Sequence, residues 1–406
     1  MKKDIDALMK ERKIDALVAQ GSTVNDPVMY YLLNGVNVSG TYIKKRGEKP
    51  YLVHGPMERG EAAKTGLKLI SASKFDIQKI YNACRDRKEA HAVFTSTVLG
   101  QLKVKGKVAF YGNYQLGSGF DLLKRLTHHC PKITVAREPE KNLAIAARET
   151  KDPDEVGQIK KAGLGVGRAF NAVIGGVRKM KVSGDAIMKE KGKKLLIGDL
   201  HRMMREELYG NGLVNTSGMI ISQGRDAGVP HNSGCLSEPV KLGRTIVFDI
   251  YPQGLGGGYY FDFTRTLCFG HASGKYLDIY KLVSEAQDIA YDRIRTGVMT
   301  KSIEQAVCML FERQGYPTFL SKPKTETGYC HSLGHGVGLN VHESPTFGLA
   351  KTNHDMILPG QVFTVEPGLY YPEKGFGIRL EDIVYIDQRG KPVNLTRYPR
   401  KLVVEM

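Results

Sequence analysis

Residues 243–269 read GRTIVFDIYPQGLGGGYYFDFTRTLCF, and residues 360–386 repeat the pattern as GQVFTVEPGLYYPEKGFGIRLEDIVYI. In both stretches an acid follows the first glycine by six residues, Asp249 in the first and Glu366 in the second. A second acid follows in each after a loop rich in turn-forming residues. Apolar, strand-forming residues surround all of these acids. The two copies predict an α+β fold with duplicated halves and pseudo-twofold symmetry.

Each stretch is predicted to form a β-hairpin whose two acids face each other. Directly opposed residues of an antiparallel hairpin have position numbers with a constant sum, and their side chains lie about 4.5–5.5 Å apart on one face. For Asp249 and Asp262 the centre falls at 255–256, and for Glu366 and Glu381 it falls within PEKGFG. Both centres are rich in turn residues. The acids of each pair are therefore predicted to project side by side.

The four acids sit in apolar contexts, VFDI, FDFT, FTVE and GIRLED, which predict burial. Two buried like charges at this distance either share a proton or need a cation. Four acids converging from two related hairpins suit a pair of divalent metals about 3.5–4 Å apart. For any one acid taken alone, pairing with an arginine is the alternative, and Arg265 and Arg379 are available for it.

Histidines are concentrated between the hairpins, in GYCHSLGHGVGLNVHESP at 328–345, which holds His331, His335 and His342. The segment is too rich in glycine for a stable helix, so it is predicted to be a site-forming loop and strand. His335 is the best ligand candidate because its flanking glycines allow the backbone to approach closely. A lone histidine is more often a satisfied core residue. His231, in AGVPHNSG before the first hairpin, is a second loop histidine placed to overlook the site.

The length of 406 residues exceeds what one hydrophobic core usually supports, so two domains are predicted. Residues 1–148 are predicted to form an α/β domain with an opening helix, the strand DALVAQ, the hairpin YIKKRGEKPYLVH, and the strands KVAFYG and KITVAR. Residues 149–406 alternate helices with β-hairpins. A long helix opens this second domain, with Asp152 as its cap, Pro153 at its first position, and Glu155 reaching back.

Composition bounds the class of protein. The net charge is +17, and the first 150 residues carry 26 basic against 15 acidic residues. Because the basic clusters hold few aromatic residues, a solvated surface is favoured over a nucleic-acid partner. Six cysteines without C-x-x-C spacing predict reduced thiols and a cytoplasmic protein rather than a disulfide framework. The apolar runs are too short for a membrane span, and the charged first residues do not fit a signal peptide.

The acids and histidines, in this order, resemble the creatinase/prolidase/aminopeptidase P metallopeptidase family, whose catalytic domain has the pita-bread fold. The likeness covers about residues 150–400, and the first domain is similar to the one that precedes it in prolidases and aminopeptidases P. The resemblance implies that Asp262 and Glu381 bridge two metal ions. The implied ligand set is Asp249, Asp262, His335, Glu366 and Glu381.

Metal chemistry then implies the reaction. Two divalent cations, Mn²⁺, Co²⁺, Fe²⁺ or Zn²⁺, would generate a bridging hydroxide that attacks the peptide carbonyl. Glu366 is the candidate proton shuttle. The resemblance implies that His231 and His342 are catalytic residues that contact the substrate. Arg379 is a further candidate for substrate binding. The expected enzyme is an exopeptidase that cleaves the N-terminal Xaa-Pro bond of peptides.

Several readings of the family resemblance stay open. Prolidases of the archaeal type carry an arginine shortly after the HE of HESPTF, where Thr346 stands in this chain, so an Xaa-Pro dipeptidase is weakened against an aminopeptidase P. The first hairpin has a loop two residues longer than is usual, and this even insertion keeps both acids on one face. A homodimer is expected from the family. The alternative is a non-catalytic binding protein that uses its basic N-terminal domain, but such relatives typically lose metal ligands.

Overall fold

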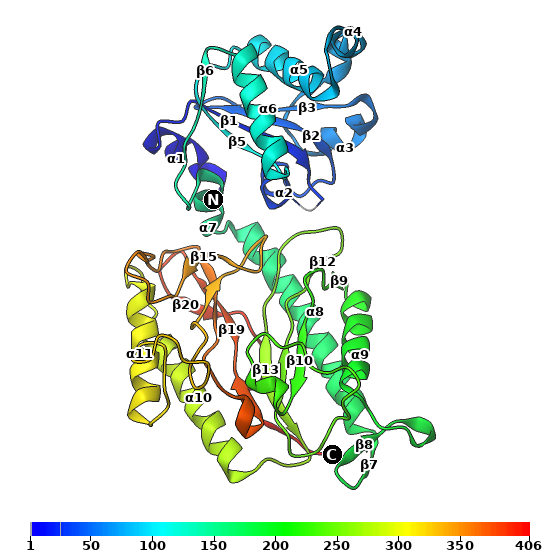
Figure 1. Ribbon diagram of the computed structural model, residues 1–406, viewed down its shortest axis with the longest axis vertical. Helices are drawn as coiled ribbons and strands as arrows, with labels where there is room; N and C mark the ends of the chain where they lie inside the picture. Colours follow the sequence, from blue (N-terminus) through cyan, green and yellow to red (C-terminus); the bar gives the residue numbers. More distant parts are fainter. Residues whose placement is uncertain (1, 25) are drawn as a thin grey trace. The chain divides into compact units, whose positions relative to one another are not determined.

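The structure, a computed structural model, describes residues 2–24 and 26–406. The chain divides into two compact units (Figure 1). The boundary falls between Arg148 and Glu149, and the loop tip 256–258 groups with the first unit.

The first unit is built on a six-stranded mixed sheet in the order β4-β3-β2-β1-β5-β6. Strand β1 pairs antiparallel with β2 and parallel with β5, and β2 and β3 form the predicted hairpin. The predicted strands DALVAQ, KVAFYG and KITVAR are confirmed as β1, β5 and β6 within one or two residues. The strand bounds are β1 Ala16–Ser22, β2 Ser39–Lys45, β3 Tyr51–His54, β4 Lys68–Ser71, β5 Gly106–Tyr111 and β6 Ile133–Val135.

Helices cover this sheet through a core of aliphatic side chains. Val98 of α5 and Leu126 of α6 pack in one cluster with Val18 of β1 and Val108 of β5. Burying these side chains in contact with one another holds the two helices against the sheet. The helices are α1 Ile5–Glu11, α2 Pro27–Leu32, α3 Arg59–Lys64, α4 Ile77–Ala83, α5 Arg87–Gln101, α6 Leu116–His129 and α7 Leu143–Glu149.

The second unit opens with the long helix α8 (Pro153–Arg178). Asp152 is its N-cap residue, Pro153 takes the first position, and the Glu155 carboxylate accepts a hydrogen bond from the Asp152 backbone N–H at 2.7 Å. The predicted start of this helix is confirmed. The Tyr259 hydroxyl donates to the other oxygen of Glu155 at 2.5 Å, which ties the helix to the first hairpin of the unit.

Two helix pairs and two sheets alternate along the second unit, as the repeat predicts. Helices α8 and α9 (Ile197–Gly210) precede the sheet β10-β11-β13-β21, and α10 (Gly274–Arg293) and α11 (Thr300–Arg313) precede the sheet β15-β14-β16-β19-β20. In Figure 1, α8 and α9 lie on one side of the strands, and α10 and α11 lie on the other. The strand bounds are β10 Ile220–Gln223, β11 Ile246–Asp249, β13 Thr264–Phe269, β14 His335–Gly336, β15 Glu343–Thr346, β16 Val362–Val365, β19 Asp382–Ile386, β20 Pro392–Asn394 and β21 Val403–Val404.

The register of the second hairpin is as predicted, whereas the predicted register of the first is wrong. Val365 pairs with Asp382, and Gly368 pairs with Arg379 in the inner strands β17 (Gly368–Tyr371) and β18 (Phe376–Arg379), so Glu366 falls opposite Glu381. In the first hairpin Asp249 pairs with Thr264 instead of Asp262.

The shift in the first hairpin comes from its glycine-rich turn. Gly256, Gly257 and Gly258 all have positive φ, at 82°, 101° and 122°, so the turn centre falls one residue later than predicted. Only glycine takes such a run of conformations without strain. The partner of Asp249 moves by two positions, an even number, and Asp249 and Asp262 still line one cavity.

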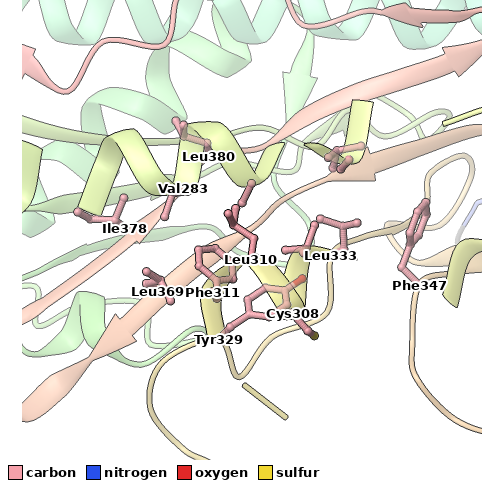
Figure 2. Packing of buried hydrophobic residues seen from close by; sticks show 14 of the residues in the cluster. Val283, Cys308, Leu310, Phe311, Tyr329, Leu333, Phe347, Leu369, Ile378 and Leu380 are labelled. Carbon is pink, nitrogen blue, oxygen red and sulfur yellow. The ribbon is translucent and has the colours of Figure 1, made fainter. Parts of the chain in front are cut away.

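An apolar core lies between α10, α11 and the second sheet. Figure 2 shows Val283 of α10 and Phe311 of α11 packed near Leu369 and Ile378 of the inner hairpin, all of them fully buried or nearly so. This packing fixes the helix pair behind the strands that carry two of the acids. Within the described residues, no helix is both long and apolar enough to cross a membrane. All six cysteines are free.

Candidate metal centre

The four acids stand at equivalent strand ends of the two hairpins. Asp249 ends β11 and Glu366 directly follows β16, whereas Asp262 and Glu381 come just before β13 and β19. The exposed fractions of these acids lie between 2% and 8%. The Glu381 backbone N–H donates to the Thr264 carbonyl at 3.1 Å, which joins the two hairpins directly. The repeat in the sequence therefore brings four carboxylates together across one seam.

These acids share a cavity of about 320 Å³ with four histidines. Every predicted metal-ligand residue and both predicted substrate-contacting histidines lie on its wall. No lysine or arginine is among the described residues that line it. The lining residues are Ser217, Ile220, His231, Asp249, Tyr251, Asp262, His331, His335, Val341, His342, Glu366 and Glu381.

His335 is held with one ring nitrogen facing the acids. Its Nδ1 lies 3.1 Å from the Gly336 carbonyl, which can only accept a hydrogen bond, so Nδ1 carries a proton. Its Nε2 lies 3.2 Å from Glu366 Oε1 and 3.7 Å from Asp262 Oδ2. One ligand atom each from His335, Asp262 and Glu381 lie within 4.8 Å of one another. This backbone-oriented imidazole is the arrangement that metal-binding histidines use.

Burial dominates the electrostatics of the acids. It raises the pKa of Asp262 and of Glu381 well above the usual carboxyl range, and the charges of the neighbouring acids add to the effect. Burial also raises the pKa of Asp249, although Arg379 opposes it. Glu366 behaves differently: burial favours its neutral form, but His331, His335 and Arg379 outweigh it and lower its pKa to about 2.

The donor set fits divalent cations. Four buried carboxylates meet in one cavity, and without further positive charge the protein can keep them only by leaving some protonated. A divalent ion removes this cost by pairing with the ionised oxygens. Carboxylate oxygens with one imidazole nitrogen suit first-row divalent metals. The residues that would hold such ions are Asp249, Asp262, His335, Glu366 and Glu381.

Three more histidines surround the acids. His331 Nδ1 faces the Ser332 carbonyl at 2.9 Å, so its Nε2 is free to accept from His231 Nε2–H, 3.3 Å away. Burial lowers the pKa of His331, although the nearby Glu366 carboxylate opposes this shift. The His342 ring stands edge-on to His335 with centroids 4.2 Å apart, and burial together with the charge on His335 lowers its pKa to about 4.

Arg379 lies behind the acids, outside the set of residues that line the cavity. Its side chain is 1% exposed and forms a buried ion pair with Asp249. The guanidinium also donates to the Tyr370 hydroxyl at 3.0 Å and to the Thr264 hydroxyl at 3.2 Å. All of these partners belong to the protein. The structure thus places Arg379 beside Asp249, behind the acids that line the cavity, and its contact with substrate stays a prediction.

Two threonines that the sequence reasoning missed each donate a hydrogen bond to one of the acids. The Thr264 hydroxyl donates to Glu381 Oε2 at 2.7 Å, and the Thr364 hydroxyl donates to Glu366 Oε1 at 3.0 Å. Each threonine lies two residues from an acid of its own hairpin, in FDFT and FTVE. Thr364 bonds the acid of its own hairpin and could have been found from this spacing, whereas Thr264 bonds Glu381 of the other hairpin.

Glu304 of α11 is a second group that was missed. It is fully buried, and its two oxygens accept from the Tyr329 hydroxyl at 2.6 Å and from the Leu333 backbone N–H at 2.7 Å. These partners flank His331 by two residues on each side, so Glu304 fastens the histidine loop to the helix. Burial raises its pKa to about 8. The available signal was an acid on the apolar face of a helix, three residues before Val307.

Comparison with known proteins identifies this arrangement. Residues 157–388, which cover the candidate site, match metallopeptidase family M24. The Xaa-Pro dipeptidase of Pyrococcus furiosus is 33% identical over 185 residues, 45% of this chain and 48% of that protein. The Xaa-Pro dipeptidase of Lactobacillus helveticus is 27% identical over 242 residues, 59% of this chain and 58% of that protein. The alignments with the first curated relatives span about half of their length.

Solved structures match along nearly the whole chain. The X-Pro aminopeptidase from Thermotoga maritima superposes with a TM-score of 0.75 at 22% identity, covering 98% of this chain and 100% of that one. The prolidase from Pyrococcus horikoshii gives a TM-score of 0.71 at 22% identity, covering 98% and 99%. At this identity the matches establish the fold.

The fold and the site together define a metallopeptidase architecture with two related halves. The chain belongs to metallopeptidase family M24. The predicted resemblance to the creatinase/prolidase/aminopeptidase P group and the predicted pita-bread fold are confirmed.

Proposed function

We propose that the chain is a metal-dependent exopeptidase that hydrolyses the N-terminal Xaa-Pro bond of peptides. The observation that carries the proposal is the convergence of four buried carboxylates and His335 on one cavity. Membership of family M24 and the likeness to Xaa-Pro dipeptidases support the same reaction class.

In this proposal the metal ions are held by Asp249, Asp262, His335, Glu366 and Glu381. When bound, a pair of divalent cations acidifies water and polarises the scissile carbonyl. Thr264 and Thr364 keep the acids oriented through their hydroxyl hydrogen bonds. Arg379 fixes one carboxylate from behind and balances part of the negative charge. Mn²⁺, Co²⁺, Fe²⁺ and Zn²⁺ all suit this donor set.

The remaining cavity residues act on the substrate. His342, with a pKa of about 4, is neutral near pH 7 and can donate one N–H to an oxygen that becomes negative during attack. His231 points its Nε2–H at His331, so its other nitrogen faces away from that contact. Glu366 stays ionised and is the candidate to receive and return the proton.

We further propose that peptides longer than dipeptides are the preferred substrates. A dipeptide brings its free carboxylate close to the cleaved bond, and binding it there calls for a cationic partner. Among the described residues that line the cavity there is no such cation outside the histidines. Thr346 does not supply one, because its side chain is uncharged, and its backbone N–H and hydroxyl both donate to Asp355, at 2.8 Å and 3.3 Å. The proposed specificity is therefore that of an aminopeptidase P, which removes the first residue of peptides longer than dipeptides.

Two further expectations complete the proposal. The six free cysteines support a reducing compartment such as the cytoplasm. A homodimer is carried over from the family resemblance, and light scattering of the purified protein would test it.

The test uses matched peptides. Protein stripped of metal and reloaded with Mn²⁺, Co²⁺ or Zn²⁺ would be assayed on Xaa-Pro dipeptides, Xaa-Pro-Yaa tripeptides and Xaa-Ala controls, with Asp262→Asn as the blank. Metal-dependent cleavage of the tripeptides supports the whole proposal. Cleavage of the dipeptides alone would overturn the length preference. Activity equal to the blank on every substrate would overturn the assignment.

A further inference from the structure

A second, larger cavity of about 1030 Å³ lies in the second unit and shares no residue with the candidate metal centre. It is open to solvent and is bordered by the end of α8, the start of α9, the hairpin of β7 (Lys181–Ser183) and β8 (Ala186–Met188), and residues 189–192. Figure 1 shows this hairpin at the end of the helix pair. We call it the lysine–methionine cavity, after the side chains described next.

The wall of this cavity is basic. Five lysine or arginine side chains line it, against two acids. One of the acids, Asp199, is already neutralised by ion pairs with Lys189 and with Arg202, the latter at 2.9 Å. Lys179, Lys181 and Lys191 are exposed and form no ion pair within the described part of the chain. Glu190, the other acid of the wall, offsets only part of the charge of these three lysines, so the cavity keeps a net positive charge.

The floor between these charges is apolar and adaptable. Met180, Met188 and Met203 line it and are half-buried, and Val182 is 43% exposed. Methionine side chains are flexible and polarisable, so they suit a surface that receives apolar side chains of varied shape. Unpaired cations around such a floor would attract an anionic partner and then bury its apolar groups.

We propose that the lysine–methionine cavity docks an acidic peptide segment that carries apolar side chains. Its carboxylates would pair with Lys179, Lys181 and Lys191, and its apolar residues would lie on the methionine floor. A peptide is favoured over single-stranded nucleic acid because no aromatic side chain is among the described lining residues, and base stacking needs one. The surplus of positive charge over the whole chain, +17, speeds encounter with such a partner.

The test measures binding and not peptidase activity. A fluorescein-labelled peptide of alternating glutamate and leucine, blocked at its N-terminus, would be titrated with the full-length protein and followed by fluorescence anisotropy. The test variant is Lys179→Glu/Lys181→Glu/Lys191→Glu. The control variant, Lys322→Glu/Lys324→Glu/Lys391→Glu, changes three exposed lysines of the same unit and gives the same net charge. Circular dichroism would check that both variants fold.

We expect the test variant to bind the peptide at least about tenfold more weakly than the wild type, and the control variant to change affinity by less than about threefold. A glutamate–serine peptide of equal charge should bind more weakly than the glutamate–leucine peptide, since it lacks apolar side chains. Equal losses in both variants would overturn the proposal, as would equal binding of the two peptides. Tighter binding of labelled oligouridylate than of the peptide, lost in the test variant alone, would overturn the choice of partner.

Discussion

The buried carboxyl of Glu304 can be tested directly, because one substitution removes its ability to ionise while keeping its hydrogen bonds. The change to glutamine keeps the size of the side chain and an oxygen for the Leu333 N–H, while the amide can donate to the Tyr329 hydroxyl. Only the capacity to ionise is lost. Any difference between wild type and variant that depends on pH therefore reports the titration of this one buried carboxyl.

The direction of the pH dependence of stability follows from the pKa of Glu304. Burial raises the pKa of Glu304 from 4.5 to about 8 in the folded chain. Between these values the folded state holds a proton that the unfolded state releases, so its contribution to stability is fully present below about pH 4.5 and is lost as pH rises through about 8. At about 1.4 kcal/mol for each unit, the whole change is on the order of 5 kcal/mol, and structural relaxation reduces it.

The assay is urea unfolding of metal-stripped protein, followed by circular dichroism at several values between about pH 5 and about pH 8.5. As pH rises over this range, the unfolding free energy of the wild type should fall by about 2 to 5 kcal/mol more than that of Glu304→Gln. Glu312→Gln, on the same helix, is the control. Hydrogen bonds from Ser321 and Thr318 lower the pKa of Glu312, so this carboxyl is ionised in the folded and unfolded states over the whole pH range. The difference in unfolding free energy between Glu312→Gln and the wild type should therefore not change with pH. A flat difference for Glu304→Gln as well would refute the buried position of Glu304.

Three further predictions concern the candidate metal centre. Arg379→Met leaves Asp249 buried without its ion-pair partner, so the free energy of unfolding of the metal-free protein should fall by about 3–5 kcal/mol in a urea titration. Thr264→Val removes the hydrogen bond to Glu381 and should weaken Mn²⁺ binding, measured by calorimetry, by about tenfold, whereas Thr264→Ser should bind as the wild type does. Mn²⁺ at about a hundred times its dissociation constant should raise the unfolding free energy of the wild type by about 2.7 kcal/mol per independent site, and unchanged stability would contradict a metal centre.

Local patterns and the internal repeat in the sequence predicted the main elements of the fold. The duplicated strand–acid–turn–strand–acid pattern predicted two hairpins. It also predicted that they converge, because buried acids from both copies need a shared cation or proton. The register of the second hairpin was predicted correctly from the rule that opposed residues have position numbers with a constant sum. The centre of its turn lies where it was predicted, and Gly375 takes the left-handed conformation there. The first hairpin has three glycines in a row, each able to take positive φ, so the turn centre could not be read from residue types.

The supporting groups of the site depend on contacts between elements distant in the chain. Arg379 lies two residues before Glu381 and so shares its side of the strand, which made a contact with substrate a reasonable prediction. Its ion-pair partner, Asp249, belongs to the other hairpin, and the packing of β18 beside β11 brings the two side chains together. Glu304 reaches the histidine loop in the same way, through a helix whose orientation the sequence does not specify.

The central claim is that the acids around Asp262 hold the metal that drives peptide hydrolysis. The most direct measurement titrates metal-stripped protein with Mn²⁺ and records, after each addition, both the metal bound and the rate of Xaa-Pro-Yaa cleavage, with Asp262→Asn in parallel. Activity should rise together with bound metal in the wild type, while the variant binds weakly and stays inactive. Hydrolysis by the stripped protein, or equal activity of the variant, would contradict the account.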